Sequence, residues 1–144
     1  MKNLLLEEVK YKINKTKYGV WRRYLYPTGA CFEEFRAYRT LMGLPLIHYT
    51  VGINPETGKR VIAKGFIGVG KIATGVIAIG HAAFGVIAIG QLGIGIILGL
   101  GQASVGFISI GQLAIGLLFG LGQFATGHTV IAQLGIGHYV IVKK

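Results

Sequence analysis

The feature that most constrains this chain is a glycine that recurs about every five residues through its C-terminal two thirds. The segment GVIAIGQLGI at 85–94 is followed, two glycine units later, by the closely similar GFISIGQLAI at 106–115. The leading glycines stand at 65, 75, 85, 95, 106, 116, 127 and 137, so that from position 85 onward their spacing alternates between ten and eleven. A single ten-residue unit would not alternate, so the pattern predicts a closed coil of about 21 residues with two unlike halves.

Two folds can hold such a repeat, namely transmembrane helices and a β-solenoid. On an α-helix, glycines five residues apart would be rotated by about 140° and would spiral around the axis instead of forming a contact stripe. Each glycine inside a helix also costs roughly 0.8–1 kcal/mol. Short strands that turn at glycines accommodate the same spacing. We therefore predict an all-β fold over 44–144, a β-solenoid of about four to five coils of about 21 residues, with membrane helices as the alternative.

The alternation of side chains along a strand assigns an inside and an outside to the expected coils. In the segment VIAIG it points Ile87 and Ile89 to one side and Ala88 to the other. We expect the large side chains to point inward and small ones, such as Ala88 and Ser109, to point outward. The predicted core is Ile87, Ile89, Leu92, Ile94, Ile108, Ile110, Leu113 and Ile115.

Polar residues follow the second glycine of each unit and are expected to stack at two corners of the coil. Stacked glutamine amides can hydrogen-bond along such a column, which would fix the register of the coils. A polar stripe that lines a pore between copies of the chain is the alternative. The predicted ladders are Gln91, Gln112 and Gln133 below Lys71 at one corner, and Gln102 and Gln123 below His81 at the other.

Residues 1–43 differ in composition from the repeat and are predicted to form a small α+β cap. Basic and apolar residues alternate in the first half of this segment, which indicates β-structure. The segment 30–43 is expected to be a helix, because Phe32 and Phe35 fall at helical spacing and a glycine ends it. The end of a solenoid exposes unpaired strand edges, and the cap would cover one of them. The chain is thus expected to consist of a basic aromatic cap and a glycine-rich solenoid, which meet at residues 43 and 44.

The repeat lacks charge, although the chain as a whole carries a net charge of +10. Residues 72–142 contain no Asp, Glu, Lys or Arg, whereas the surface of a soluble domain is about 25–35% charged. Much of this surface is therefore not expected to face bulk water. Phe66, Val86 and Phe107 each follow a leading glycine, and they either form outward stripes for a partner or lipid, or tuck into the turns.

The N-terminal segment provides a second candidate surface, in which Lys and Arg are interleaved with Tyr and Trp. This mixture suits an anionic membrane surface, where aromatic rings lie at the depth of the headgroups. A solvated basic face over a small core is the simplest interpretation, and single-stranded nucleic acid is the least favoured partner. The candidate membrane or partner surface consists of Lys10, Lys12, Lys15, Lys17, Trp21, Arg22, Arg23, Tyr24, Phe66, Val86 and Phe107.

The sequence shows no constellation typical of catalysis or metal binding. The repeat has no acidic residue for paired-carboxylate chemistry, and GFIGVGK at 65–71 lacks the Ser or Thr that follows the lysine of a phosphate-binding loop. His81, His128 and His138 are expected at three different places of the coil, where they cannot converge on one ion. We therefore expect no enzymatic activity, no metal and no cofactor.

Two segments carry a resemblance to known proteins: LMGLPLIH at 41–48 and AKGFIGVGKIATGVIAIG at 63–80. The chain resembles a group of uncharacterised bacterial proteins, which pair an opening GLPL segment, closed by Ile or Val and His, with long A-x-G-x-I-A-I-G repeats. The similarity covers about residues 40–144 and implies no particular activity. The chain is similar to bactofilins only in general plan, and that similarity implies a short, β-helical, self-assembling protein of the cytoplasm.

These observations predict a non-enzymatic, self-associating structural or scaffold protein, either a homo-oligomer or a filament. The alternative is a membrane-embedded or membrane-bound assembly, a pore or an effector, with apolar faces in lipid. The expected partners are further copies of the chain and an anionic membrane. The single Cys31 fits a reducing compartment, so we expect a cytoplasmic protein or one at the inner face of the membrane. Lys143 and Lys144 would hinder open-ended strand pairing, which favours lateral or closed assembly.

Overall fold

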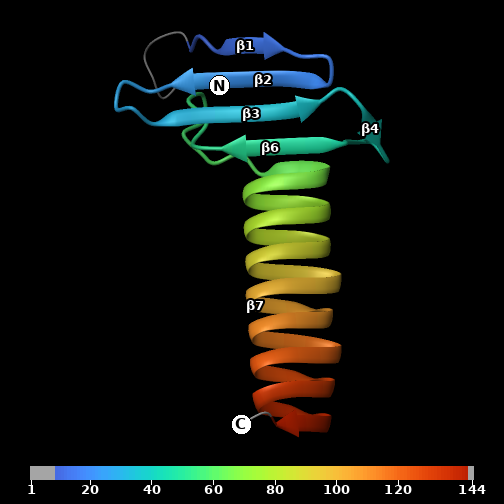
Figure 1. The fold of residues 1–144 in the computed structure, drawn as a ribbon. Helices are drawn as coiled ribbons and strands as arrows, with labels where there is room; N and C mark the ends of the chain where they lie inside the picture. Colours follow the sequence, from blue (N-terminus) through green and yellow to red (C-terminus); the bar gives the residue numbers. More distant parts are fainter. Residues whose placement is uncertain (1–8, 143–144) are drawn as a thin grey trace.

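The computed structural model describes residues 9–142, and in this range the chain forms strands and loops without a helix (Figure 1). Five strands form one mixed sheet in the order β1-β2-β3-β6-β7. They are β1 (Lys12–Lys15), β2 (Gly19–Leu25), β3 (Cys31–Ala37), β6 (Ile47–Val51) and β7 (Ala63–Val142). A second, two-stranded sheet consists of β4 (Thr40–Leu41) and β5 (Leu44–Pro45). All pairs are antiparallel except β6 with β7, which is parallel.

The predicted fold class is therefore wrong. The structure has a mixed sheet that includes one 80-residue strand, not the expected β-solenoid with an α+β cap. The membrane-helix alternative also fails over the described range. Lys143 and Lys144, with their predicted effect on strand pairing, lie outside the described residues. The boundary expected between residues 43 and 44 falls in the loop between β4 and β5, and the main sheet crosses it through the β3–β6 pair.

Residues 30–43 form β3 and β4, where a helix was predicted. Each of the seven residues of β3 pairs with a residue of β2, from Cys31 opposite Leu25 to Ala37 opposite Gly19. Burial alternates over residues 31–35 of β3, with Phe32 and Glu34 inside, which is the period of a strand. The spacing of the aromatic residues was compatible with a helix, but this segment forms a strand because it pairs with β2 along its whole length.

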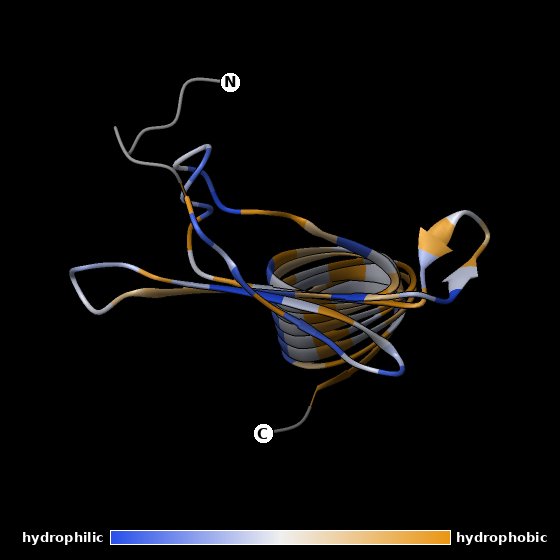
Figure 2. Ribbon diagram, turned by 90° about the horizontal axis from the view of Figure 1, so that it is seen from above, coloured by the Kyte–Doolittle hydropathy of each residue, from blue (hydrophilic) through white to orange (hydrophobic). Residues whose placement is uncertain are grey.

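Figure 1 shows β7 winding around one axis in a stack of turns, with β6, β3, β2 and β1 lying across the same axis at its N-terminal end. Only four residues of β7 pair with β6. A strand of 80 residues must therefore pair over most of its length with its own neighbouring turns. Figure 2 looks down the axis, and there the successive turns superpose in one narrow outline.

Close approaches between glycines measure one turn of β7. A Cβ added to Gly80 would overlap the carbonyl oxygen of Gly70, and one added to Gly90 would overlap that of Gly80. The same relation joins Gly101 to Gly90 and Gly111 to Gly101. One turn therefore advances the chain by ten or eleven positions, and one full repeat of the sequence corresponds to two turns. Glycine is required at this corner, because the backbone of the preceding turn occupies the place of a side chain.

The inside of the wound strand holds small side chains. One such turn is only about 35 Å of extended chain, so its two sides lie too close together to enclose leucine or isoleucine. The buried hydroxyls of Ser104 and Ser109 hydrogen-bond to each other at 2.6 Å. The inward positions recur every five or six residues and are Ala63, Gly68, Ala73, Ala78, Ala83, Ala88, Gly93, Gly99, Ser104, Ser109, Ala114, Gly120, Ala125 and Val130.

The structure reverses the predicted core. Side chains alternate along the strand as expected, but the small residues point inward and the large ones outward, because a turn holds half as many residues as predicted. Ala88 and Ser109, which were expected outside, are both fully buried. Ile87 and Ile110 are half-buried on the outer surface. The other six predicted core residues are 37 to 47% exposed, and they are Ile89, Leu92, Ile94, Ile108, Leu113 and Ile115.

Candidate functional site

One polar column runs along the outside of β7. Its members follow one another at the spacing of one turn, so they stack from turn to turn, and all are exposed. The two predicted glutamine ladders are therefore one column, because the turn is half as long as expected. Its members are Lys71, His81, Gln91, Gln102, Gln112, Gln123 and Gln133.

A shallow groove of about 650 Å³ follows this polar column. On its other side it is lined by a neighbouring column in which Ala82 and Ala103 alternate with Leu92 and Leu113. Within residues 9–142 no hydrogen bond is found between the amides of the five glutamines, so the predicted amide bonding is not seen. These amides remain free to bond to something else.

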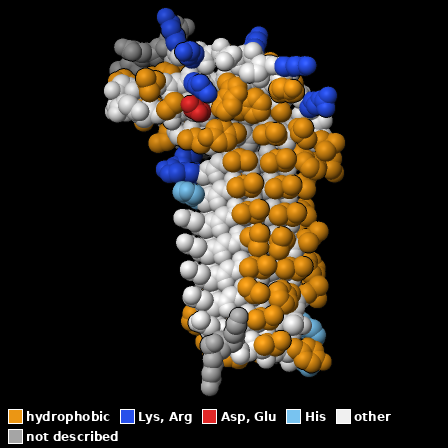
Figure 3. Space-filling view, viewed as in Figure 1, with side chains coloured by type: hydrophobic (Ala, Val, Ile, Leu, Met, Phe, Trp, Pro, Cys, Tyr) orange, Lys and Arg blue, Asp and Glu red, His pale blue; other side chains and the backbone are white. Residues whose placement is uncertain are grey.

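The remaining outer columns of β7 are almost entirely apolar. Phe66, Val86 and Phe107 lie in one such column, in which Phe66 and Val86 are half-buried, and Phe107 and Leu117 are exposed at 43% and 65%. Figure 3 shows these hydrophobic columns along the rod, beside a column of white side chains at its edge. Of the two interpretations of these residues, the outward stripe agrees with the structure.

His128 and His138 continue the apolar column of Phe107 toward the C-terminal end. Their rings are stacked, with centroids 5.3 Å apart and planes at 11°. The prediction that the histidines occupy three different places is wrong for this pair, because residues ten apart share a column in a short turn. No group of three or more metal-ligating side chains occurs among the described residues.

The basic and aromatic residues of the candidate membrane surface in the N-terminal segment fall into two sets. Lys10, Lys12, Lys15 and Lys17 are exposed on and beside β1, the edge strand farthest from β7. The other four predicted residues build the sheet. Trp21 packs on Phe35 and Tyr49, and Tyr24 packs edge-on against Tyr11 and Tyr26. Arg22 and Arg23 form ion pairs with Glu34 and Glu33 on β3.

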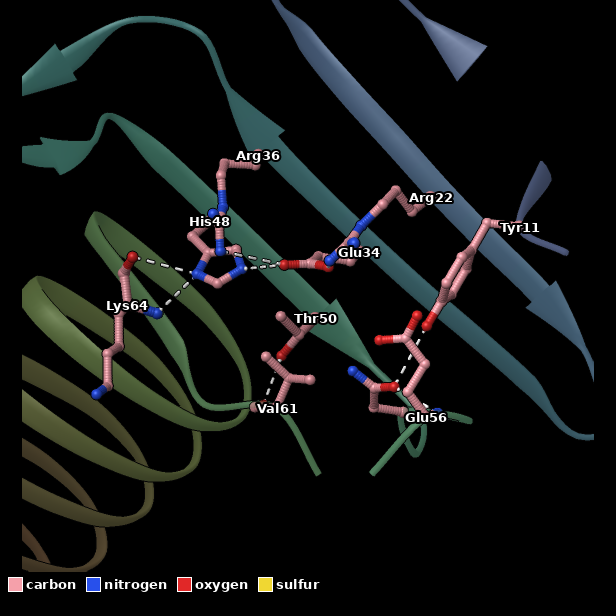
Figure 4. Close-up of polar contacts among 10 residues, drawn as sticks. Tyr11, Arg22, Glu34, Arg36, His48, Thr50, Glu56, Val61 and Lys64 are labelled. Carbon is pink, nitrogen blue, oxygen red and sulfur yellow. Dashed lines mark hydrogen bonds and ion pairs between the residues drawn. The ribbon is translucent and has the colours of Figure 1, made fainter. Parts of the chain in front are cut away.

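A buried ionic cluster joins the sheet to the first turn of β7 (Figure 4). Glu34 and His48 are both 2% exposed, and Nε2 of His48 lies 3.0 Å from Oε1 of Glu34. Nδ1 of His48 accepts a hydrogen bond of 2.8 Å from the backbone amide of Lys64, which assigns the Nε2–H to Glu34. Arg22 also donates to Glu34 through Nε at 3.0 Å, and a terminal nitrogen of Arg36 lies 3.4 Å from the same carboxylate. The cluster therefore links β2, β3, β6 and β7.

The cluster predicts a loss of stability in acid. Burial raises the pKa of Glu34, but the hydrogen bonds from His48 and Arg22 outweigh it and lower the pKa from 4.5 to about 2. The folded state thus holds the proton less tightly than the unfolded state. About 3 kcal/mol of stability is present above pH 4.5 and is lost as the pH falls toward 2. Urea unfolding at a series of pH values should show this slope, and Glu34→Gln should flatten it. An equal slope in both proteins would contradict the prediction.

A second hollow, of about 420 Å³, lies where the sheet meets β7, and Cys31, Ile53, Arg60 and Lys71 are among its lining residues. Cys31 is exposed. Partial desolvation of its sulfur, together with the charge of the neighbouring Glu33, raises the pKa of the thiol. That direction is opposite to the activation of a cysteine nucleophile.

No family model, curated protein or solved structure matches this chain. The structure contains, among the residues it describes, no helix with the length and apolar character needed to cross a membrane. The role of the surface has to follow from its own geometry and chemistry.

Proposed function

We propose that this chain is a membrane-embedded protein in which β7 lies in the hydrocarbon of a bilayer and the sheet lies at the membrane surface. The observation that carries the proposal is the inverted character of β7, with small side chains inside and large apolar ones outside. Ile96, Ile97, Leu117 and Leu118 are 53 to 65% exposed. In water such a surface would be far larger than the apolar patches that soluble monomers tolerate.

The length of β7 supports this placement. Its 80 residues make between seven and eight turns, which at a strand spacing of about 4.8 Å gives a rod of about 36 Å. The hydrocarbon core of a bilayer is about 30 Å thick. The exposed lysines of the sheet stand at one end of this rod, where anionic headgroups would meet them.

The backbone of β7 also suits hydrocarbon. A bilayer excludes irregular strands because it cannot hydrogen-bond their N–H and C=O groups. A strand that pairs with its own turns leaves such groups free only at its two ends. The first end pairs with β6, and a rod of about 36 Å brings the last turn to the opposite interface, where water is available.

A self-associating scaffold is the second candidate, in which copies of the chain cover one another's apolar columns in water. The exposed apolar columns support it as well, since protein can cover them as lipid does. Such a scaffold would be recovered as large particles without detergent. The membrane-embedded protein would be extracted only with detergent. A chain that inserts from the cytoplasm would have its sheet at the inner face of the membrane.

Two outward lysines provide the test of insertion. Ile97 and Leu118 lie in one outer column, near the middle of β7. Each lysine costs about 3 kcal/mol at the centre of a bilayer, so Ile97→Lys with Leu118→Lys should lower partition into lipid vesicles at least a hundredfold. The double variant should keep its circular dichroism spectrum in detergent, because both side chains point away from the inside.

His81→Lys is the matched control, since His81 lies in the polar column directly below Lys71. This variant should enter vesicles like the unchanged protein. Recovery of the unchanged protein in the soluble fraction without detergent would overturn the proposal. Equal vesicle partition of the double variant and the control would overturn it too.

A further inference from the structure

We propose that two copies of the chain associate side by side in the bilayer, in parallel, through the polar column of β7. This inference rests on the proposed membrane location and adds a partner and a contact surface to it. The contact consists of the five glutamines of the column and the groove beside them. The partner is a second copy of the same chain.

The first argument is the cost of unpaired amides in hydrocarbon. A polar group moved from water into an apolar medium without a hydrogen bond costs several kcal/mol. All five glutamines are exposed and show no side-chain hydrogen bond within the described structure. Gln102 and Gln112 lie near the middle of the rod, farthest from the water at either interface. A membrane-embedded β7 therefore needs a polar occupant along this one column.

The second argument is that the column is complementary to itself. A glutamine amide has two N–H donors and an acceptor oxygen, so two facing amides can bond to each other. The spacing of the glutamines is set by the turns of β7 and is the same in every copy. A two-fold axis parallel to β7 brings each glutamine against its equivalent along the whole column. Polar side chains hold membrane segments together in the same way.

The orientation follows from the sheet. Its exposed charges, Lys10, Lys12, Lys15 and Lys17, keep the sheet at a membrane surface. Two copies inserted from the same side are therefore parallel. Ala82 and Ala103, which alternate with leucines beside the polar column, leave room in the groove for the partner's side chains. The other outer columns are almost entirely apolar and remain facing lipid.

Disulfide trapping in vesicles tests the contact. In a Cys31→Ser background, Gln102→Cys places one thiol in the polar column, and Ile97→Cys places one in an apolar column. Diamide oxidises two facing thiols to a disulfide and takes up their two electrons and two protons. The bond requires Cα atoms about 5.5 Å apart, so only a close contact is trapped. We expect at least tenfold more covalent dimer from Gln102→Cys than from Ile97→Cys.

Replacement of all five glutamines by leucine is the second measurement. The variant should stay in the vesicles and keep its circular dichroism spectrum, because the column lies on the outside of β7. Energy transfer between donor-labelled and acceptor-labelled copies should fall to the level measured for two proteins that do not associate. Equal trapping at both cysteine positions, or no trapping at Gln102→Cys in protein that is in the vesicles, would overturn the dimer. Unchanged energy transfer in the leucine variant would overturn it as well. Failure of the membrane proposal would be recognised separately, by recovery of the unchanged protein in the soluble fraction.

Discussion

Ala88→Leu should open the wound strand, whereas the same change at Ala82, six residues earlier, should leave it intact. Ala88 is fully buried, and its neighbours inside the rod are other small residues. Three extra carbons cannot be placed there without separating backbones that pair with the turns above and below. Overpacking of this kind costs about 1–3 kcal/mol in ordinary cores, and we expect about 3 kcal/mol here because the whole turn must widen.

Ala82 provides a matched control, because it lies in the outer column in which Leu92 and Leu113 already stand. Thermal unfolding in detergent, followed by circular dichroism, should show a midpoint roughly 10 °C lower for Ala88→Leu and an unchanged midpoint for Ala82→Leu. A similar effect of both changes would contradict the assignment of Ala88 to the inside and Ala82 to the outside.

The strand character of the repeat could be predicted from its sequence, but the size of the turn could not. The leading glycines are alternately ten and eleven residues apart from position 85 onward, and this alternation suggested one closed coil made of both spacings. In the structure it arises because every second turn contains one additional residue. Gly95 and Gly116 occupy the same place in successive repeats. A Cβ added to either would overlap the carbonyl oxygen three residues ahead, that of Leu98 or that of Phe119. The additional residue is thus accommodated within a single turn. It does not mark a boundary between two halves of a larger coil.

The prediction of which side chains of β7 point inward was wrong, because large apolar residues were assumed to lie inside. That assumption holds for proteins in water and fails when the available interior is too narrow. A signal was present in the sequence, since Ala73, Ala78, Ala83 and Ala88 recur every five residues. A buried column of alanines at this period indicates a narrow interior and therefore a short turn. Ile89, 37% exposed, consequently belongs to the outer surface.

The candidate site was predicted only in part. The glutamine column could be recognised because its members recur with the repeat. The cluster of Glu34 and His48 could not, because the two residues come from strands whose pairing is visible only in the folded chain. His48 stands in the LPLIH segment, and nothing in that segment indicates that its partner is Glu34.

Glu34→Gln should lower the free energy of unfolding by about 3 kcal/mol at pH 7, the second large effect that the structure predicts. The substitution keeps the shape of the side chain but removes the negative charge that faces Arg22 and the buried His48. Removing one partner of a buried ionic cluster typically costs about 3–5 kcal/mol, because the remaining charges lose their compensation. The lower end applies here, since the side chain of Arg22 is 40% exposed and water can solvate part of its charge.

Glu33→Gln is the adjacent control on the same strand. Glu33 pairs with Arg23 at 3.3 Å, but the side chains are 31% and 51% exposed, and surface pairs of this kind are worth about 0–1 kcal/mol. Urea unfolding should therefore distinguish the two variants by at least about 2 kcal/mol, a difference that shrinks below pH 4.5 as Glu34 of the unfolded chain becomes protonated. Equal losses at positions 33 and 34 would show that the buried cluster does not hold the sheet to β7. A loss confined to Glu34→Gln that disappears in acid would identify the charge of this carboxylate as what fixes the first turn of the rod to the sheet.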